Sequence, residues 1–250
     1  MFSEINEPFC AGRDASRLLF DLSILLSCIK EIDNRNILDF AGGTGWVSEY
    51  LNRAGFDVTI IDIAPEISQL MEKRVKADAR LEPARMHAVV CDGHNLDFCS
   101  DGYFGNIICF DSLHHMSDLS LVIKEMFRIL VPGGRASFAE PGAKHANSRE
   151  TQEFIRKYKS KDPNWIERSI VLDEINEIAN SVGFSPLHIK PFLLPSMVDY
   201  SFHDWKYFAM NAVGQKNYIF HLLSFNYDSR VIFFIDKPFR KKRWSILRFQ

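Results

Sequence analysis

Five acidic side chains at the ends of short apolar runs are the residues best suited to chemistry in this sequence of 250 residues. They are Asp39, Asp62, Asp92, Asp111 and Glu140. One such residue alone would only mark a turn. If the runs are parallel strands, however, their carboxyl ends share one edge of a sheet, and ligands of open α/β sheets bind outside that edge. The pattern therefore predicts one polar cleft ringed by five carboxylates.

A glycine-rich loop, Asp39-Phe-Ala-Gly-Gly-Thr-Gly45, follows the first apolar run. Glycine permits tight turns and close approach of the backbone to a ligand, and the helix expected from Trp46 presents free N–H groups. A dinucleotide fingerprint needs a third glycine where Ser48 stands, which disfavours a nicotinamide-dependent oxidoreductase. Asp62 ends the next run, where a carboxylate can accept both hydroxyls of a ribose. The loop and Asp62 together predict a nucleoside ligand.

Two adjacent histidines, His114 and His115, follow the fourth apolar run. Imidazole is the usual base near neutral pH, and a hydroxyl nucleophile needs its proton removed. Glu140 lies on the same predicted edge, where a carboxylate could orient an imidazole and favour its cation. The alternative is that one of the two histidines only caps or packs.

No metal centre is predicted. The spacing of His94, His114 and His115 matches no zinc pattern, and Asp111 and Glu140 do not form the paired acidic ligands that a hard divalent ion needs. The five cysteines contain no CxxC pair, which disfavours structural zinc and a disulfide framework and fits a reducing compartment.

Apolar runs alternate with amphipathic stretches through residue 140. We expect strands at 36–40, 57–63, 87–91, 106–111 and 135–140, and helices at 14–32, 46–55, 65–80 and 119–130. This alternation predicts a parallel sheet with helices on both faces. Later in the chain we expect helices at 148–160 and 171–182, strands at 185–192 and 229–237, and an aromatic-rich insertion at 195–227 before the last strand.

Four segments resemble, in the right order, the motifs of class I S-adenosylmethionine-dependent methyltransferases. They are ILDFAGGTGWVSEYL, VTIIDIAPEI, VVCDGHNLDF and FDSLHHMSDLSLVIKEMFRILVPGGRASFAEPG, all within residues 35–142. The resemblance implies a Rossmann-like, mostly parallel seven-stranded sheet. It also implies S-adenosyl-L-methionine as the cofactor, with S-adenosyl-L-homocysteine as its product.

The resemblance also implies a role for individual residues. The cofactor would be bound by Asp39, Ala41, Gly43, Gly45, Asp62, Ile63, Asp92, Gly93 and the backbone near Phe110. Asp62 would take the ribose hydroxyls, and Asp92 would take the adenine amino group. Two positions depart from the family pattern: Ala41 replaces the usual first glycine, and Gly105-Asn106 replaces an acidic residue, with the loss of a surface interaction only.

The segment SLHHM, with an acidic residue ending the fifth run, resembles sugar O-methyltransferases. That resemblance implies that His114, His115 and Glu140 form the acid/base set, with His115 preferred as the base. We therefore expect methyl transfer to a hydroxyl, on a sugar of a glycan or of a glycosylated small molecule. Two alternatives stay open: a C- or N-methyltransferase of a lipid, quinone or small metabolite, and a non-catalytic S-adenosylmethionine-binding protein.

The composition, 46% hydrophobic and 25% charged with a net charge of −2, predicts one globular core and no basic field for nucleic acid. We expect a single domain over 1–250, with an N-terminal helical cap (1–34), a cofactor-binding core (35–142) and a C-terminal part (143–250). Acceptor contacts are expected from the cap and the insertion. The candidates in the insertion are Tyr200, Phe202, His203, Trp205, Tyr207 and Phe208.

The same aromatic part could bury against a second copy of the chain, as a homodimer. The basic run 240–244 could touch an anionic membrane surface, although a solvated tail is the expected interpretation. The sequence has no apolar window long enough to span a bilayer and no signal-peptide pattern. We therefore expect a cytoplasmic protein.

Overall fold

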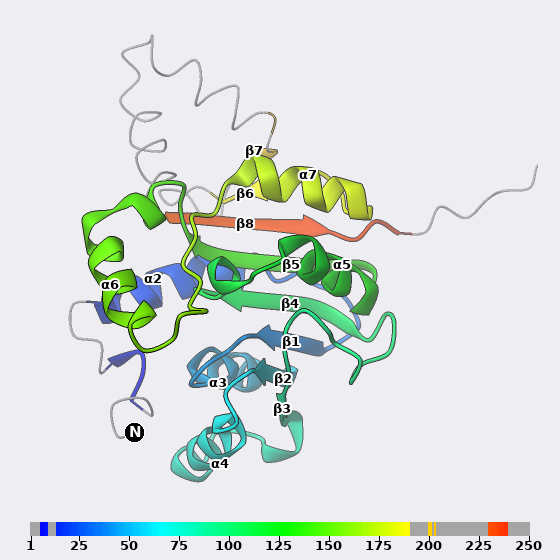
Figure 1. The fold of residues 1–250 in the computed structure, drawn as a ribbon. Helices are drawn as coiled ribbons and strands as arrows, with labels where there is room; N and C mark the ends of the chain where they lie inside the picture. Colours follow the sequence, from blue (N-terminus) through cyan, green and yellow to red (C-terminus); the bar gives the residue numbers. More distant parts are fainter. Residues whose placement is uncertain (1–5, 10–13, 191–199, 202, 204–229, 240–250) are drawn as a thin grey trace, which may run out of the picture.

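A central sheet with helices on both faces forms the body of the molecule in a computed structural model (Figure 1). The structure describes residues 6–9, 14–190, 200–201, 203 and 230–239. The strands are β1 (Asn36–Phe40), β2 (Asp57–Asp62), β3 (Met86–Val90), β4 (Phe104–Phe110), β5 (Leu130–Pro141), β6 (His188–Ile189), β7 (Tyr200–Ser201) and β8 (Arg230–Asp236). Their order in the sheet is β3-β2-β1-β4-β5-β8-β6-β7.

The five strands from β1 to β5 run parallel, as the alternating sequence pattern predicts. β8 pairs antiparallel with β5, and β6 and β7 follow it as antiparallel additions. The expected Rossmann-like, mostly parallel sheet is therefore confirmed, and β7, with two residues, adds an eighth strand at the edge.

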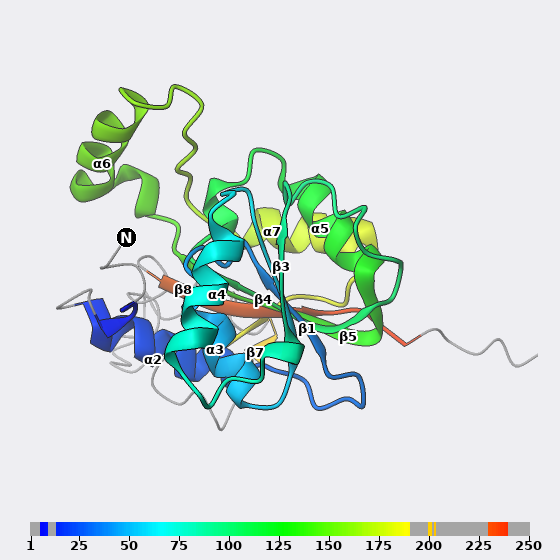
Figure 2. The same cartoon turned by 90° about the horizontal axis from the view of Figure 1, so that it is seen from below.

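The helices divide between the two faces of the sheet (Figure 2). α5 (Leu119–Ile129) and α7 (Leu172–Val182) cover one face, and α2 (Asp14–Ser27) and α3 (Trp46–Arg53) cover the other. α4 (Ile67–Ala77) packs beside β3, and α6 (Arg149–Lys159) stands beyond the carboxyl ends of the parallel strands. Three short 3-10 helices complete the described elements: η2 (Pro83–Arg85), η3 (Leu113–His115) and η4 (His145–Asn147).

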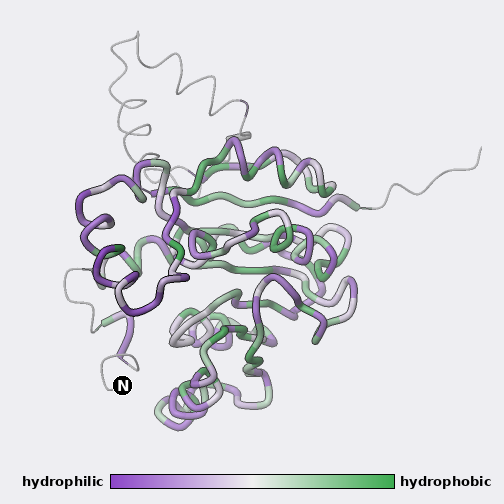
Figure 3. Tube along the Cα trace, in the orientation of Figure 1, coloured by the Kyte–Doolittle hydropathy of each residue, from purple (hydrophilic) through white to green (hydrophobic). Residues whose placement is uncertain are grey.

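Each face of the sheet has its own apolar core. One core joins α5 and α7 to the sheet through residues such as Met126, Phe138 and Ile175, and the other joins α2 and α3 to it through Leu25 and Trp46. Hydrophobic colour follows the strands in Figure 3, whereas α6 is mostly hydrophilic. Burial on both faces explains why the runs that form β1 and β4 are almost continuously apolar.

The helix expected at 14–32 is shorter than predicted and ends at Ser27. Beyond its end, the N–H of Lys30 donates to the side chain of Asn106 at 2.9 Å, and the Asn106 amide donates to the Lys30 carbonyl at 3.1 Å. Asn106 is buried. The expectation that the departure from the family pattern at Gly105-Asn106 affects only a surface interaction is therefore wrong. Asn106 binds the segment after α2 to β4.

Other boundaries also differ from expectation. In the described part of the strand expected at 185–192, two residues form β6, and β5 begins five residues earlier than expected, at Leu130. Most of the expected insertion, 195–227, and the basic run 240–244 lie outside the described residues. None of the described helices is both long enough and apolar enough to cross a membrane.

Candidate functional site

The first cavity opens at the carboxyl ends of β1 to β4 and has a volume of about 460 Å³. This size is typical of a site for a small ligand. Its walls come from the segments after these strands and from the loop between α6 and α7. Six of the residues predicted to bind the cofactor line it: Ala41, Gly43, Asp62, Ile63, Asp92 and Gly93.

Two carboxylates on the wall of the first cavity are held by backbone N–H groups. Asp62 accepts hydrogen bonds from the N–H groups of Gly43 and Ala64, each at 2.9 Å. Asp92 accepts from the N–H of His94 at 3.0 Å and from its ring at 2.6 Å, and these bonds lower the pKa of Asp92 below its usual value. Each carboxylate keeps lone pairs for the hydroxyl or amino groups of a ligand.

Space and apolar surface in the first cavity also fit a nucleoside. Gly43 adopts φ 55, and a Cβ added there would meet no heavy atom within 4 Å. A Cβ on Gly93 would contact the ring of Phe40, so only glycine fits this bend. The side chain of Ile63 is 73% exposed and offers an apolar surface beside Asp62. These residues fit the nucleoside part of S-adenosylmethionine.

The buried side chain of Asp39 packs against the glycine-rich loop. Its Oδ2 accepts a hydrogen bond from the Ser48 hydroxyl at 2.6 Å, and its Oδ1 has no partner among the described residues. Burial raises the pKa of Asp39 to about 6, against the hydrogen bonds from Ser48. Ala41 lies at φ 51 in the left-handed region, which is costly for any residue with a Cβ. Gly45, at φ 75, caps α3.

Not every predicted cofactor residue reaches the cavity. Asp39, Gly45 and Phe110 lie outside its lining, and the ring of Phe110 packs against Trp46 at 5.1 Å. The expectation of one cleft ringed by five carboxylates is also wrong. Asp39 and Glu140 are buried beneath the surface, Asp62 and Asp92 reach the first cavity, and Asp111 reaches a second one.

The second cavity, of about 490 Å³, lies beside the first at the ends of β4 and β5. It is lined by Arg17, Asp111, His114, His115, Pro141, His145, Phe154, Glu167 and Arg230. Of the described residues that form these walls, His115 is common to both cavities. The structure therefore places an imidazole at the junction of the first cavity and a second cavity lined mostly by charged and polar side chains.

His114 lies between two carboxylates. Its Nδ1 is 2.8 Å from Oε2 of Glu140, and its Nε2 is 3.3 Å from Oε1 of Glu167. Ionised carboxylates only accept, so both ring nitrogens donate and the ring is an imidazolium. Burial alone would lower the pKa of His114, but the bonds to the two glutamates outweigh it and raise the pKa to about 9. His114 is therefore a cation at neutral pH and has no lone pair to act as a base.

His115 has the opposite character. Its pKa is lowered by burial and by the neighbouring charge of His114, whose ring centroid is 3.9 Å away. Its Nδ1 lies 2.8 Å from the carbonyl oxygen of Ile166. A carbonyl only accepts, so Nδ1 carries the proton and Nε2 of the neutral ring keeps its lone pair. This arrangement suits a general base.

Glu140 anchors the segment that carries both histidines. Its carboxylate accepts from the backbone N–H groups of Ser112 at 3.0 Å, of Leu113 at 2.8 Å and of His114 at 3.4 Å. Glu140 is fully buried, so it cannot touch a ligand in either cavity. Its place in the structure is behind His114, as a support.

Several residues of the second cavity were not expected from the sequence. Glu167 follows α6 in a segment without a motif, yet it contacts three histidines. Arg230, at the start of β8, forms ion pairs with Asp21 of α2 and with Asp111. Burial would raise the pKa of Asp111, but Arg230 and Arg17 lower it. No local pattern could reveal these contacts, because each partner is distant in the sequence.

Ligand atoms of His114, His115 and Glu167 lie within 4.8 Å of one another. Such a spacing would admit a metal ion, but these side chains are already joined by hydrogen bonds to Glu140, to the Ile166 carbonyl and to one another. The absence of a metal from the site stays a prediction. Of the acceptor candidates in the insertion, Phe202, Trp205, Tyr207 and Phe208 lie outside the described residues.

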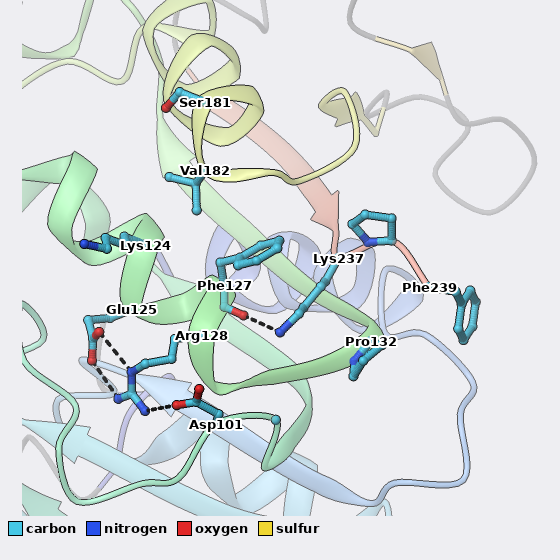
Figure 4. A pocket seen from close by; sticks show the side chains of 12 residues that line it. Asp101, Lys124, Glu125, Phe127, Arg128, Pro132, Ser181, Val182, Lys237 and Phe239 are labelled. Carbon is cyan, nitrogen blue, oxygen red and sulfur yellow. Dashed lines mark hydrogen bonds and ion pairs between the residues drawn. The ribbon is translucent and has the colours of Figure 1, made fainter. Parts of the chain in front are cut away.

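A third hollow, of about 980 Å³, lies between α5, α7 and the end of β8 (Figure 4). Two of the cations that line it have partners: Arg128 binds Glu125 at 2.7 Å and Asp101 at 3.0 Å, and Lys237 donates to the Phe127 carbonyl at 2.8 Å. None of the residues predicted to act in binding or catalysis lines this hollow.

Comparison with known proteins finds methyltransferases. Residues 38–138 match the family model described as "Methyltransferase domain". A ubiquinone biosynthesis O-methyltransferase of Xanthomonas oryzae pv. oryzae is 29% identical over 110 residues, which cover 42% of each chain. A ubiquinone/menaquinone biosynthesis C-methyltransferase of Geotalea daltonii is 34% identical over 115 residues, or 45% of this chain and 48% of the relative. The chain thus spans less than half the length of these curated relatives.

Solved structures share the fold over more of the chain. Geranyl diphosphate C-methyltransferase of Streptomyces coelicolor aligns with a TM-score of 0.63 and 14% identity, covering 93% of this chain and 88% of that one. Phosphoethanolamine N-methyltransferase 2 of Haemonchus contortus, in complex with S-adenosyl-L-methionine, aligns with a TM-score of 0.59 and 17% identity, covering 88% and 52%. Over residues 38–138, the chain is therefore similar to a methyltransferase domain, and it shares the fold of these methyltransferase structures.

Proposed function

We propose that the protein transfers a methyl group from S-adenosylmethionine to a hydroxyl of an acceptor bound in the second cavity. The observation that carries the proposal is the place of His115, which lines both cavities, has a lowered pKa and donates from Nδ1 to the Ile166 carbonyl, so that the lone pair lies on Nε2. A neutral hydroxyl is a weak nucleophile, so a base beside the acceptor raises its reactivity. The bound cofactor supplies an electrophilic methyl group on sulfur.

Residues of the first cavity would hold the cofactor at its nucleoside end. Asp62 would accept the ribose hydroxyls, Asp92 would accept the adenine amino group, and Ile63 would pack on the adenine. Gly43 has open space on the side where a Cβ would stand, and Gly93 lines the same cavity. Fixing both reactants in line is the main contribution of such a site, because it removes the entropic cost of bringing them together.

His115 would take the proton of the acceptor hydroxyl on Nε2 while its Nδ1 stays bound to Ile166. His114 and Glu140 would hold it in this state, because Glu140 lies outside the lining of both cavities and His114, which lines the second cavity, has no lone pair to take the proton. The three residues predicted to be catalytic therefore divide their work: His115 is the proposed base, and the other two are supports.

The relatives favour a ring-bearing hydroxyl compound, such as a phenol related to quinones, as the acceptor. The printed names of those relatives refer to ubiquinone biosynthesis, and an aromatic group formed by Phe154, Tyr158 and Trp165 lies next to His115. A sugar hydroxyl is the second candidate. It is supported by the polar lining of the second cavity, where Arg17 and Asp111 could bind further hydroxyls.

We also propose that the whole chain is one domain. α2 contributes Arg17 to the second cavity, and β8 contributes Arg230. Segments at both ends of the core therefore supply walls of the same site, as expected for a cap and a C-terminal part that bind the acceptor.

Calorimetric titration with S-adenosylhomocysteine tests the cofactor site first. We expect wild-type binding and a loss of at least about tenfold in affinity for Asp62→Ala, which removes the carboxylate but no core contact. Asp57→Ala, at the other end of β2, is the matched control and keeps wild-type affinity. A folded wild type without affinity for S-adenosylhomocysteine would refute the proposal.

A panel of phenols, sugars and carbon acceptors, with product masses measured, tests the acceptor. His115→Ala should lower kcat for a hydroxyl acceptor about a hundredfold, because it removes the base. The exposed His87→Ala is the control. Methylation at carbon or nitrogen with an unaffected His115→Ala variant would contradict a hydroxyl acceptor while leaving the methyltransferase assignment intact.

A further inference from the structure

Glu167 is the common partner of three imidazoles. One of its carboxylate oxygens lies 3.3 Å from Nε2 of His114 and 2.6 Å from Nε2 of His145, and the other lies 3.6 Å from Nδ1 of His115. Its side chain is only 5% exposed. A carboxylate this deeply buried is stable only when its charge is compensated, so the contacts with the histidines are essential to it.

The segment from Trp165 to Arg168 is fixed to the histidines by several bonds. The Ile166 carbonyl accepts from His115, and the N–H of Arg168 donates to the carbonyl of His114 at 3.2 Å. The indole N–H of Trp165 donates to Glu167 at 3.1 Å. Trp165 and Ile166 line the first cavity, whereas Glu167 lines the second. One short segment thus reaches both cavities and both histidines.

Charge explains why the carboxylate of Glu167 matters in addition to that of Glu140. The two imidazoles are tilted by 45° with their ring centroids 3.9 Å apart, and two rings this close resist being charged together. The groups that face His114 are Glu140 from β5, Glu167, His115, His145 from η4 and Asp111 after β4. Glu140 and Glu167 bind the two nitrogens of His114, so the charge stays on that ring and the neutral form is left to His115.

We propose that Glu167 is a positioning residue of the transfer reaction, which keeps His114 protonated and, through its segment, holds His115 as the neutral base. This inference rests on the proposed function, since it names the residue that prepares the proposed base. Glu167 would bind no cofactor and accept no proton from the acceptor. Its effect would reach the reaction only through the two histidines.

Glu167→Gln tests the inference, because glutamine keeps the shape of the side chain and removes its charge. We expect kcat to fall about tenfold to a hundredfold with the affinity for S-adenosylhomocysteine changed less than about twofold. The imidazole of His114, followed by NMR and assigned with His114→Gln, should titrate at a lower pH than in the wild type. The wild-type pKa of His114 is raised to about 9.

Glu174→Gln is the matched control. Glu174 pairs at 2.7 Å with Arg168, the residue next to Glu167, and its side chain is 40% exposed. In the described contacts it touches neither His114 nor His115, and it lines neither the first nor the second cavity. It should leave kcat and the titration of His114 unchanged. If Glu167→Gln does not fold, Glu167→Asp takes its place, and a lowered kcat with a shifted His114 titration supports the role.

Wild-type kcat together with an unchanged titration of His114 in the Glu167 variant would overturn the inference and leave the proposed function standing. A wild type that binds S-adenosylhomocysteine but methylates no acceptor would instead count against the proposed function. In that case, the NMR titration still decides whether Glu167 sets the protonation of His114.

Discussion

At the scale of single residues, burial decides what each polar side chain can do. Asp62 and Asp92 remain accessible in the first cavity, whereas Glu140 is buried and supports backbone N–H groups. His114 and His115 are neighbours in the sequence, yet one is held as a cation and the other as a neutral ring. The difference arises because both ring nitrogens of His114 face carboxylates, whereas Nδ1 of His115 faces a backbone carbonyl.

The protonation of His114 should make stability depend on pH. Its folded pKa of about 9 exceeds the unfolded value near 6.5, so its contribution is complete below about pH 6.5 and is lost as the pH rises through about 9. As the pH rises from about 6.5 to about 9, the free energy of unfolding measured in urea should fall by about 1–3 kcal/mol more in the wild type than in His114→Gln. Equal losses in the two proteins would contradict a raised pKa.

Ala41 offers a test of strain in the glycine-rich loop. Its φ of 51 is costly for alanine but free for glycine, although glycine also gains entropy in the unfolded chain. Ala41→Gly should therefore raise the free energy of unfolding by about 0.5–1 kcal/mol. Ala77→Gly, at the exposed end of α4, is the control and should lower it by about 0.5 kcal/mol. A destabilised Ala41→Gly would show that the loop is not strained.

At the scale of elements, the segments after parallel strands assemble the site. β1 to β4 end along one edge, and the segments that follow them form the first cavity. η3 directly follows β4 and is fastened to the end of β5 through Glu140. The histidine pair is therefore placed by two adjacent strands together.

Glu140→Gln should loosen this connection between η3 and β5. Glutamine offers one acceptor oxygen and turns an N–H group toward the backbone donors of Ser112 and Leu113. We expect the free energy of unfolding to fall by about 2 kcal/mol and kcat to fall as well. Glu177→Gln, on the exposed face of α7, should change neither quantity. Wild-type stability in the Glu140 variant would show that these N–H groups find other partners.

At the scale of the whole molecule, α2 and β8, which lie near opposite ends of the described chain, meet beside the second cavity. Arg230 of β8 binds Asp21 of α2 at 2.8 Å and also binds Asp111 after β4. Asp21 is 1% exposed, and burial raises its pKa despite Arg230 and Arg17. This network joins the cap, the core and the last strand.

Removing Arg230 should therefore destabilise the fold. Arg230→Gln leaves the negative charge of the buried Asp21 with less compensation. The free energy of unfolding, measured in urea, should fall by about 3 kcal/mol. The double variant with Asp21→Asn should recover at least about 1 kcal/mol of that loss, because the two residues are coupled. Arg149→Gln, from an exposed pair on α6, should cost less than about 0.5 kcal/mol. Strictly additive effects of Arg230 and Asp21 would contradict the network.

Much of the fold and the first cavity could be predicted from the sequence. Alternating apolar and amphipathic runs indicated the parallel sheet, and the glycine-rich loop with Asp62 and Asp92 indicated residues that line the first cavity. These signals are local, because a strand, its following loop and the next helix are adjacent in the chain. The end of the helix expected at 14–32 was less predictable, because the segment after it is held by hydrogen bonds to a distant residue, Asn106.

The sequence by itself determined the class of fold, the order of the motifs and the presence of two histidines beside a predicted cofactor. Only the tertiary structure decided which histidine is charged, that Glu140 lies behind rather than in the site, and that Glu167 and Arg230 join it. The physical reason is that periodicity and turn chemistry act over a few residues. Protonation and ion pairing, in contrast, depend on burial and on partners that approach through folding from far along the chain.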